Sequence, residues 1–486
     1  MSKPDDPTPT PPSLLSAESR GGDINEGGLD FQMAVLMTYL PRWLAMEGFT
    51  MLIREASGDF EAQFFAPGHG YVREFLEAKD HSVTPKEFWT EIEHFQKFDL
   101  AAKDEFQWFT LVSAGLSTEL HPLTNGLRRL RDPYAFYDPD SAILEKSYKD
   151  YVAIVEKMAR SADDASFLFT KVKIEPDWAP VRDSARAHFR DALLNEIPAF
   201  QDVPGRFIDE AYAALATIVR ASRNKPIRRD QMENVLRGFL SQDQRMVRPA
   251  VRIHTAMDAR HEAPPQELVF AWAKFFGGEA RNFPPPSEWS DVLLPELRDT
   301  KQWVLEHRAT RRIRLSGNRR LSASVAFGSV FSAVAGFTID MIGRDDVIWS
   351  TDAHARADTP TYELMAAASS ASTKADQLVV SIGVPRDISG DVQAALSAHG
   401  LQTAARLHLH GSGGLASADQ ANAIVADIKQ HIAAELCKTA AKKIHLFIAC
   451  PAFLALLLGH RLNATAPIQC YEWAGGRAYV ATCLLA

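Results

Sequence analysis

Cysteine is scarce in this chain, and its scarcity narrows the class of protein. The 486 residues include 4 cysteines, all in the last fifth of the sequence and none in C-x-x-C spacing. Disulfide frameworks and zinc modules need closely spaced cysteines. We therefore expect reduced, buried thiols in a cytoplasmic protein.

Long apolar runs and targeting signals are also missing. Residues 1–13 carry acids and prolines where a secretory signal needs basic and apolar residues. The longest uncharged apolar run, 321–339, is interrupted by Gly328 and Gly336, whereas a membrane helix needs about 20 strongly apolar residues. We expect a buried strand and a short helix in this run, and no membrane partner.

An excess of basic charge is absent as well. The formal net charge is -8 at pH 7, so any DNA-binding surface has to be a local patch. The length exceeds that of one ordinary core and predicts two or three domains. Residues 1–20 are rich in Pro, Asp and Thr, which predicts a disordered tail.

The ordered sequence begins with a helix and a β-rich stretch. Apolar spacing predicts a helix over Phe31–Glu47 and strands over Phe49–Arg54, Phe60–Ala66 and Tyr71–Ala78. The segment 84–87, Thr-Pro-Lys-Glu, predicts the start of another helix, with Thr as N-cap and Glu closing a capping box.

Three polar residues of this stretch are candidates for chemistry. Glu77 and Lys79 share one face of a strand because side chains alternate, and the hairpin brings Asp59 alongside. Two carboxylates can hold Mg²⁺ or Mn²⁺, which activates a water and neutralises charge on a phosphodiester. The lysine can orient that water or stabilise the transition state. The alternative is a solvated strand edge, because Asp followed by Glu-x-Lys is a loose pattern.

This order of elements, with Gly58-Asp59 and Glu77-Ala78-Lys79, resembles the PD-(D/E)XK nuclease core. The segment 28–32, Gly-Leu-Asp-Phe-Gln, resembles the opening helix of nuclease domains in bacterial antiviral effectors. The resemblance implies that Asp59 and Glu77 bind metal, that Lys79 is catalytic and that Gln32 assists, with Glu55 a further possible acid. Two positions depart from the pattern: Gly58 stands where the superfamily name has Pro, and Glu77 where relatives often have Gln.

The middle and the end of the chain differ in pattern. Residues 150–296 are expected to be mostly helical, with helices over 182–196, 206–222, 226–242 and 267–276. The last part predicts strands over 377–383, 405–410, 444–450, 468–473 and 478–485, and helices over 391–397, 418–442 and 452–462. Such alternation implies parallel strands joined by crossover helices, a Rossmann-like arrangement.

Five passages of the C-terminal part resemble the SAVED domain, which consists of two fused Rossmann-like (CARF-like) halves and binds cyclic trinucleotides. The passages are 319–328, 346–351, 445–455, 459–463 and 468–472. A SAVED domain behind a PD-(D/E)XK domain resembles the CD-NTase-associated endonucleases of CBASS antiphage systems. In that family, ligand binding drives oligomerisation and the cutting of double-stranded DNA.

Ligands of open α/β sheets lie beyond the carboxyl ends of the strands, where small residues and arginines suit phosphates. The candidate ligand-binding residues are Arg319, Arg320, Trp349, Thr351, Pro385, Arg386, Ser412, Pro451 and Tyr471. Each candidate has a structural alternative. The glycine-rich segments can be ordinary turns, the arginine-rich segment 308–320 can be a solvated face or a DNA-binding patch, and Trp349 can be a core residue. His408 and His410 share a strand face but lack a third ligand, so no metal is expected there.

We thus expect an α/β chain with a tail at 1–20, a nuclease domain at 21–155, a helical connector at 156–296 and a SAVED sensor at 297–486. The expected function is an antiviral DNA endonuclease that a cyclic oligonucleotide activates through self-association. One alternative is a sensor or adaptor whose nuclease-like domain is inactive. Another is an enzyme that degrades the cyclic nucleotide, for which the sensor half offers no evident residues.

Overall fold

The structure is a computed structural model of the chain. It describes residues 26–55, 57–132, 136–137, 141–178, 182–257, 266–278, 281–343, 346–354, 359–369, 376–462, 465–476 and 478–486. The tail expected at 1–20 lies outside these ranges. The chain divides into two compact units, unit 1 (Met1–Val247) and unit 2 (Arg248–Ala486). Each unit is described by itself.

Unit 1 is built on one mixed sheet of six strands. In order across the sheet, they are β5 (Val172–Glu175), β4 (Phe106–Leu116), β3 (Gly70–Val83), β2 (Phe60–Ala66), β1 (Phe49–Arg54) and β6 (Ile227–Arg228). Strands β1, β2 and β3 form an antiparallel meander, and β4 and β5 continue the sheet in parallel with β3. The three strands predicted from the sequence are confirmed.

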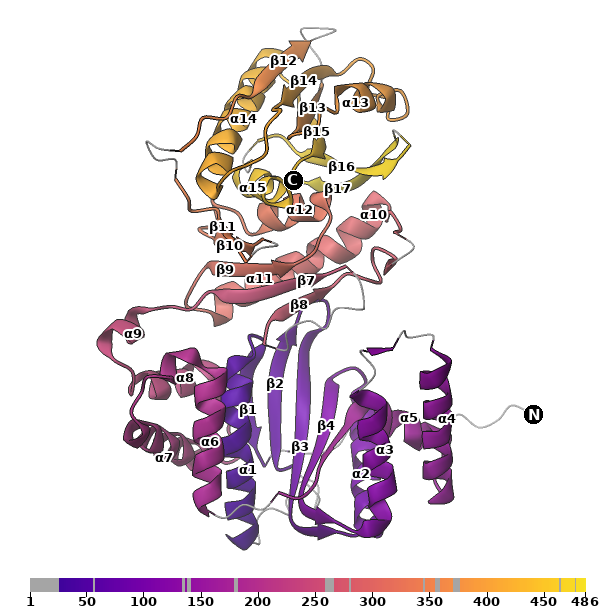
Figure 1. The fold of residues 1–486 in the computed structure, drawn as a ribbon, viewed down its shortest axis with the longest axis vertical. Helices are drawn as coiled ribbons and strands as arrows, with labels where there is room; N and C mark the ends of the chain where they lie inside the picture. Colours follow the sequence, from indigo (N-terminus) through magenta and orange to yellow (C-terminus); the bar gives the residue numbers. More distant parts are fainter. Residues whose placement is uncertain are drawn as a thin grey trace, which may run out of the picture. The chain divides into compact units, whose positions relative to one another are not determined.

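Helices cover both faces of this sheet (Figure 1). One face carries α1 (Glu26–Ala45), α6 (Arg182–Glu196), α7 (Gly205–Ala221) and α8 (Arg229–Arg237). The other face carries α2 (Pro85–Ala101), α3 (His121–Arg131), α4 (Ala142–Lys157) and α5 (Ala162–Lys171). Thr84 caps α2 as predicted, because its hydroxyl accepts a hydrogen bond from the Glu87 N–H. The predicted capping box is not closed, since the Glu87 carboxylate lies 2.8 Å from His81 Nε2 instead of bonding back to the Thr84 N–H.

The region expected to be a separate helical connector is divided between the two units. Strand β5 completes one edge of the unit 1 sheet and β6 the other, while α6 packs against α1. The short helix α9 (Gln242–Met246) ends unit 1. The helices α6, α7 and α8 bury apolar side chains in the core of the unit 1 sheet, which local helical periodicity alone does not reveal.

Unit 2 contains two sheets. The first has the strand order β11 (Ile348–Ser350), β10 (Thr338–Ile342), β9 (Arg312–Gly317), β7 (Val251–Ala256) and β8 (Leu268–Ala271). The helix expected at 267–276 is therefore wrong over its first part, where Leu268–Ala271 pairs in parallel with β7. Its apolar run was too short to distinguish a strand from a helix. The helices of this half are α10 (Pro286–Glu288), α11 (Leu294–His307) and α12 (Leu321–Val330).

The second sheet contains all five strands predicted for the C-terminal part, together with one more at its edge. Its order is β12 (Met365–Ser369), β14 (Ala405–His410), β13 (Gln377–Gly383), β15 (Lys443–Ala449), β16 (Ile468–Gly475) and β17 (Ala478–Leu485). The four central strands are parallel, which confirms the Rossmann-like prediction. The helices are α13 (Ser389–Ala395), α14 (Ala418–Thr439) and α15 (Ala452–Arg461).

The two halves of unit 2 repeat one another. In each, a strand leads into a helix, then into a parallel strand and finally into an antiparallel one: β9-α12-β10-β11 in the first half and β15-α15-β16-β17 in the second. The helices α12 and α15 pack together, and Gly328 and Gly459 hold the same place, eighth from the start, in each helix. A Cβ atom on Gly459 would lie 2.0 Å from the carbonyl oxygen of Val325, so the crossing requires glycine.

Two further expectations concern the thiols and the membrane. Among the described residues the four cysteines are free, and Cys470 and Cys483 are buried, but Cys437 is exposed on α14, against the expectation of buried thiols. Within the described ranges, no helix has the length and apolar character to cross a bilayer.

The close helix crossing predicts the effect of one methyl group. We expect Gly459→Ala to lower the free energy of unfolding of unit 2 by about 1–3 kcal/mol, because the strain of overpacking exceeds the gain in helix propensity. Gly390→Ala on α13 is the matched control, since nothing lies within 4 Å of its Cβ position. Denaturant titration of both variants measures the difference; equal stabilities would contradict the packing argument.

Candidate functional site

The first candidate site lies at the end of the unit 1 sheet where β1 ends and β2 begins. One carboxylate oxygen of Asp59 accepts a hydrogen bond from the backbone N–H of Ala78 on β3, at 2.8 Å. The other accepts one from the side-chain amide of Gln32 on α1, at 2.6 Å. Two donors from different elements thus hold Asp59 against β3.

Lys79 lies between two carboxylates. Its Nζ is 2.9 Å from Oε1 of Glu77 on β3 and 2.9 Å from Oε1 of Glu91 on α2. The side chains are largely withdrawn from solvent, with exposed fractions of 19% for Lys79 and 15% for each glutamate. Removal of the ammonium group would leave two poorly solvated carboxylates without a counter-ion.

Burial and mutual repulsion set the protonation of this cluster. Burial, and then the charge of Glu77, raise the pKa of Asp59 well above its ordinary value. Burial also raises the pKa of Glu77, although Lys79 opposes the shift. For Lys79, burial alone would lower the pKa, but Glu77 and Glu91 raise it above its usual range. The cluster therefore keeps the ammonium of Lys79, whereas the charged forms of Asp59 and Glu77 are disfavoured.

The four predicted site residues are brought together. Gln32 and Ala78 donate hydrogen bonds to Asp59, and Lys79 donates one to Glu77. The hairpin thus places Asp59 beside the strand of Glu77 and Lys79, as the sequence predicts. Glu55, the further possible acid, is engaged elsewhere. Its carboxylate is buried and pairs with Arg223 at 2.5 Å and with Arg54 at 3.4 Å.

Sequence reasoning missed Glu91. It lies three residues after Phe88 and four before Phe95, on the face of α2 whose apolar residues are buried. A carboxylate on the buried stripe of an amphipathic helix is the signal that could have identified it. Although burial would raise the pKa of Glu91, His94 and Lys79 lower it, so Glu91 is the ionised partner of the lysine.

The cluster suits a hard divalent cation in part. Asp59 and Glu77 supply oxygen ligands, and Mg²⁺ commonly binds through one or two carboxylates while it keeps several waters. Within the described residues, no group of three or more His, Cys, Asp or Glu side chains is arranged to hold a metal ion. A cation here would rely on water or substrate oxygens for its remaining ligands.

The raised pKa of Asp59 predicts that removal of its carboxylate stabilises the fold. A carboxyl whose pKa is raised in the folded state destabilises the fold as pH rises above its unfolded pKa. We therefore expect Asp59→Asn to melt at a higher temperature than the unchanged protein at neutral pH in a chelator. Each kcal/mol corresponds to about 2–4 °C in a domain of this size.

The same pair of proteins tests cation binding. Addition of Mg²⁺ should raise the melting temperature of the unchanged protein and leave that of Asp59→Asn where it was, because a ligand stabilises the state that binds it. Calorimetric melts with and without Mg²⁺ provide the measurement. A variant less stable in chelator, or equally responsive to Mg²⁺, would refute the assignment.

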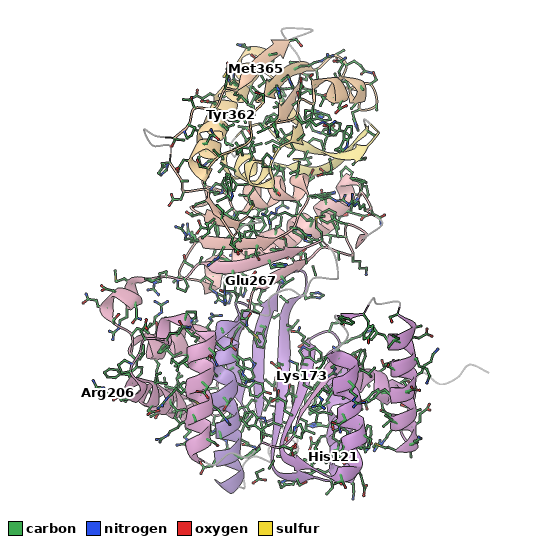
Figure 2. The ribbon with its side chains drawn as sticks, in the orientation of Figure 1. His121, Lys173, Arg206, Glu267, Tyr362 and Met365 are labelled. Atoms are coloured by element: carbon green, nitrogen blue, oxygen red, sulfur yellow. The ribbon has the colours of Figure 1, made fainter. Side chains whose placement is uncertain are left out.

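The second candidate site lies at the carboxyl ends of the parallel strands in unit 2. Backbone hydrogen bonds draw these ends together: Val384 N–H donates to the Ala449 carbonyl at 2.9 Å, and Gly411 N–H donates to the Gly383 carbonyl at 3.0 Å. The Tyr362 hydroxyl donates to the Gly413 carbonyl at 2.7 Å, and so holds the glycine-rich turn. Tyr362 is labelled among the side chains of unit 2 in Figure 2. These turns form one rim.

Four of the predicted ligand residues are exposed on this rim, as a messenger contact requires. They are Pro385, Arg386, Ser412 and Pro451. Arg386 lies over the Trp473 ring at 5.2 Å and pairs with Asp391 at 2.5 Å. Pro451 is the N-cap residue of α15, so the first N–H groups of that helix point toward the rim.

The predicted arginines Arg319 and Arg320 lie between β9 and α12, in the first half of unit 2. Arg319 is turned inward, where it donates to the Thr255 hydroxyl at 3.2 Å, and its Nε is buried without a hydrogen bond. Burial lowers the pKa of Arg319 to about 10. Arg320 lies over the rings of Phe276 and Phe283, at 4.6 and 4.5 Å.

Three other predicted contacts lie deeper. Thr351 is buried, and its hydroxyl accepts a hydrogen bond from Ile339 N–H, so it serves the first sheet. Tyr471 is buried and stacks on Phe447 at 4.2 Å. Trp349 is half-buried and packs against Phe453, which favours the core alternative. The aromatic or β-branched side chains of these three residues are therefore explained by packing within unit 2 and do not indicate ligand contacts.

The histidines of β14 also have structural partners. His408 Nδ1 is 2.8 Å from the Ser381 hydroxyl, and His410 Nδ1 is 3.3 Å from the Gly383 carbonyl. That these two histidines hold no metal stays a prediction.

Glu472 on β16 connects the two halves of unit 2. Its carboxylate accepts a hydrogen bond from the backbone N–H of Ser322, at the start of α12, at 2.9 Å. Burial raises the pKa of Glu472, while the Ser322 N–H and Arg320 oppose the shift. This carboxylate takes the place at a helix N-terminus where an anion binds, so the start of α12 is already occupied, whereas the start of α15 faces the rim.

Comparison with known proteins identifies the C-terminal part. Residues 296–485 match the family described as "SMODS-associated and fused to various effectors sensor domain", SAVED. These residues form a SAVED domain. The match begins within α11, so strands β7 and β8 fall outside it although they belong to the same sheet as β9 and β10.

Relatives resemble the chain over nearly its whole length. It is 27% identical over 473 residues to CD-NTase-associated protein 4 of Moraxella osloensis, covering 96% of this chain and 97% of that protein. A protein of the same name from an Acinetobacter species is 26% identical over 475 residues, covering 97% and 98%.

Solved structures resemble the fold of the SAVED-containing chain. One is the Acinetobacter baumannii Cap4 SAVED/CARF-domain containing receptor with the cyclic trinucleotide 3'3'3'-cAAA, with a TM-score of 0.80, 23% identity and coverage of 95% and 99%. The Moraxella osloensis Cap4 receptor has a TM-score of 0.75, 23% identity and coverage of 95% and 100%. The α/β fold class with a SAVED domain is thus confirmed.

Proposed function

We propose that this protein is a metal-dependent DNA endonuclease whose activity is controlled by a cyclic trinucleotide bound to its SAVED domain. The observation that carries the nuclease half is the cluster of Asp59, Glu77 and Lys79 at one end of the unit 1 sheet. The sensor half is supported by the SAVED match and by the Cap4 receptor with bound 3'3'3'-cAAA. The setting is an antiphage CBASS system in the cytoplasm, as the CD-NTase-associated relatives suggest.

The residues of unit 1 have distinct roles in this proposal. Mg²⁺ or Mn²⁺ held by Asp59 and Glu77 would supply an acidified water and neutralise charge on the phosphodiester. Gln32 fixes the orientation of Asp59 through its amide N–H. Lys79 stays protonated and places its ammonium where negative charge grows in the transition state, while Glu91 holds that ammonium in position.

Removal of the ammonium tests the nuclease assignment. We expect Lys79→Ala to lower the rate of plasmid cleavage, with Mg²⁺ and cyclic trinucleotide present, by roughly 10²–10³-fold, the usual loss for one transition-state donor. The double variant Lys79→Ala/Glu91→Gln removes one of the two carboxylates that lose their counter-ion and controls for folding. A folded double variant that cuts as fast as the unchanged protein would end the proposal.

The same assay gives a pH dependence. Since the pKa values of Asp59 and Glu77 are raised, both must lose protons before they can hold a cation, so cleavage should increase with pH from the acidic side. The pKa of Lys79 is raised, so the ammonium persists at neutral and mildly alkaline pH. A protein that binds the messenger but never cuts would favour the alternative of a sensor with an inactive nuclease-like domain.

Arg386 tests the messenger-binding half. An exposed guanidinium held over Trp473 suits a phosphate contact, so Arg386→Gln should weaken binding of 3'3'3'-cyclic tri-AMP by roughly 10–100-fold, the value of a charge-assisted hydrogen bond. Asp391→Asn is the matched control, because it breaks the same ion pair and keeps the arginine. Titration calorimetry measures both; equal affinities for the two variants would remove Arg386 from the site.

Ligand-induced self-association is part of the proposal, because a nuclease that was always active would endanger its own cell. Sedimentation in the same samples tests this step. Cyclic tri-AMP should increase the sedimentation coefficient of the unchanged protein and of Asp391→Asn, and have a weaker effect on Arg386→Gln. An unchanged coefficient in saturating ligand would remove self-association from the account.

A further inference from the structure

Three exposed basic residues lie at the end of α7 and in the loop that follows it. Arg220 is in the last turn of α7, and Arg223 and Lys225 precede β6. We name these three residues the α7 basic cluster. They lie outside the β1–β2 turn that carries Asp59 and outside β3, which carries Glu77 and Lys79.

Contacts place this cluster at the same end of the sheet as Asp59. Arg220 Nη2 is 3.7 Å from Oδ1 of Asp30, two residues before Gln32 on α1. Arg223 Nε is 2.5 Å from Oε2 of Glu55, and the Glu55 N–H donates to the Asp59 carbonyl at 2.9 Å. Glu55 therefore links the α7 basic cluster to the turn that carries Asp59.

The backbone fixes the same arrangement. Asn224 N–H donates to the Arg54 carbonyl at 3.0 Å, and Arg54 and Arg223 form a bridge between their backbones. The loop is thus joined to the end of β1 directly before the Asp59 turn. The cluster is held in place by the sheet and does not depend on its side-chain ion pairs for its position.

Among the α7 basic cluster and the charged residues that contact it, positive charges outnumber negative ones. Asp30 and Glu55 each engage one arginine of the cluster, and Glu55 also pairs with Arg54, but Lys225 is exposed and has no counter-ion among the described residues. A guanidinium has five N–H donors, so an arginine that pairs with one carboxylate can still donate to a phosphate. In a chain of net charge -8, this local excess is the kind of patch that DNA binding requires.

We propose that the α7 basic cluster binds the phosphate backbone of duplex DNA and presents the adjacent phosphodiester to the Asp59 site. This inference rests on the proposed nuclease function and names its substrate-positioning surface. Contacts of this kind fix the position of the duplex without reading its sequence. Cleavage without strong sequence preference follows from them.

The test is the salt dependence of DNA binding. Each phosphate contact contributes about one unit to the slope of log K against log salt. In an Asp59→Asn background in a chelator, which prevents cleavage, Arg220→Gln/Lys225→Gln should lower this slope by about two and weaken binding of a labelled duplex roughly tenfold at moderate salt. Lys225→Gln alone, which breaks no described ion pair, should lower the slope by about one.

The matched control is Lys103→Gln. Lys103 is exposed and follows the far end of α2, beside the start of β3, so its removal should leave the slope unchanged. Fluorescence anisotropy over a salt series measures all four proteins. Slopes equal to that of the Asp59→Asn parent, or a parent with no affinity for the duplex, would overturn the inference.

Failure of the inference is distinguishable from failure of the proposed function. A reduced slope in variants of a protein that never cuts DNA would support the binding surface and contradict the nuclease. In an active protein, loss of the cluster should raise the KM for DNA and leave kcat nearly unchanged, because uniform binding is lost. A fall in kcat with an unchanged KM would contradict a positioning role.

Discussion

The proposed function of unit 1 depends on two carboxylates that the fold holds close together and away from water. Asp59 is fixed by donors from α1 and β3, and Glu77 projects from β3 toward α2. Burial penalises their charges, and Lys79 relieves only part of that penalty. Such an arrangement costs stability in the free protein, and in the proposed function a bound cation would offset that cost.

Unit 2 is built from a repeated motif. Two equivalent strand-helix-strand-strand segments pack through α12 and α15, and the paired glycines allow their backbones to approach closely. The repeat is not symmetric at the helix starts. Glu472 occupies the N-terminus of α12, while that of α15 opens onto the exposed rim.

Much of this architecture could be predicted from the sequence, for identifiable reasons. Apolar runs and turn residues located β1 and β2 to the residue, and the Thr84 cap located α2. Asp59, Glu77 and Lys79 followed from period-two geometry on one hairpin, whereas Gln32 followed from the resemblance to nuclease domains. Local patterns did not show that Leu268–Ala271 pairs as a strand, or that Tyr471 is buried, because both depend on partners distant in the chain. Glu91 was missed for the same reason, since its role depends on Lys79 across the helix-sheet interface.

The central claim is tested most directly by the protons released when a cation binds. Titration calorimetry of Mn²⁺ or Mg²⁺ into the full chain, at weakly acidic pH in buffers of different ionisation enthalpy, counts those protons. Asp59 and Glu77 must give up protons to bind a cation, so we expect proton release that diminishes as pH rises and is smaller in a Glu77→Gln variant. Binding without proton release, or release unaffected by that variant, would contradict it.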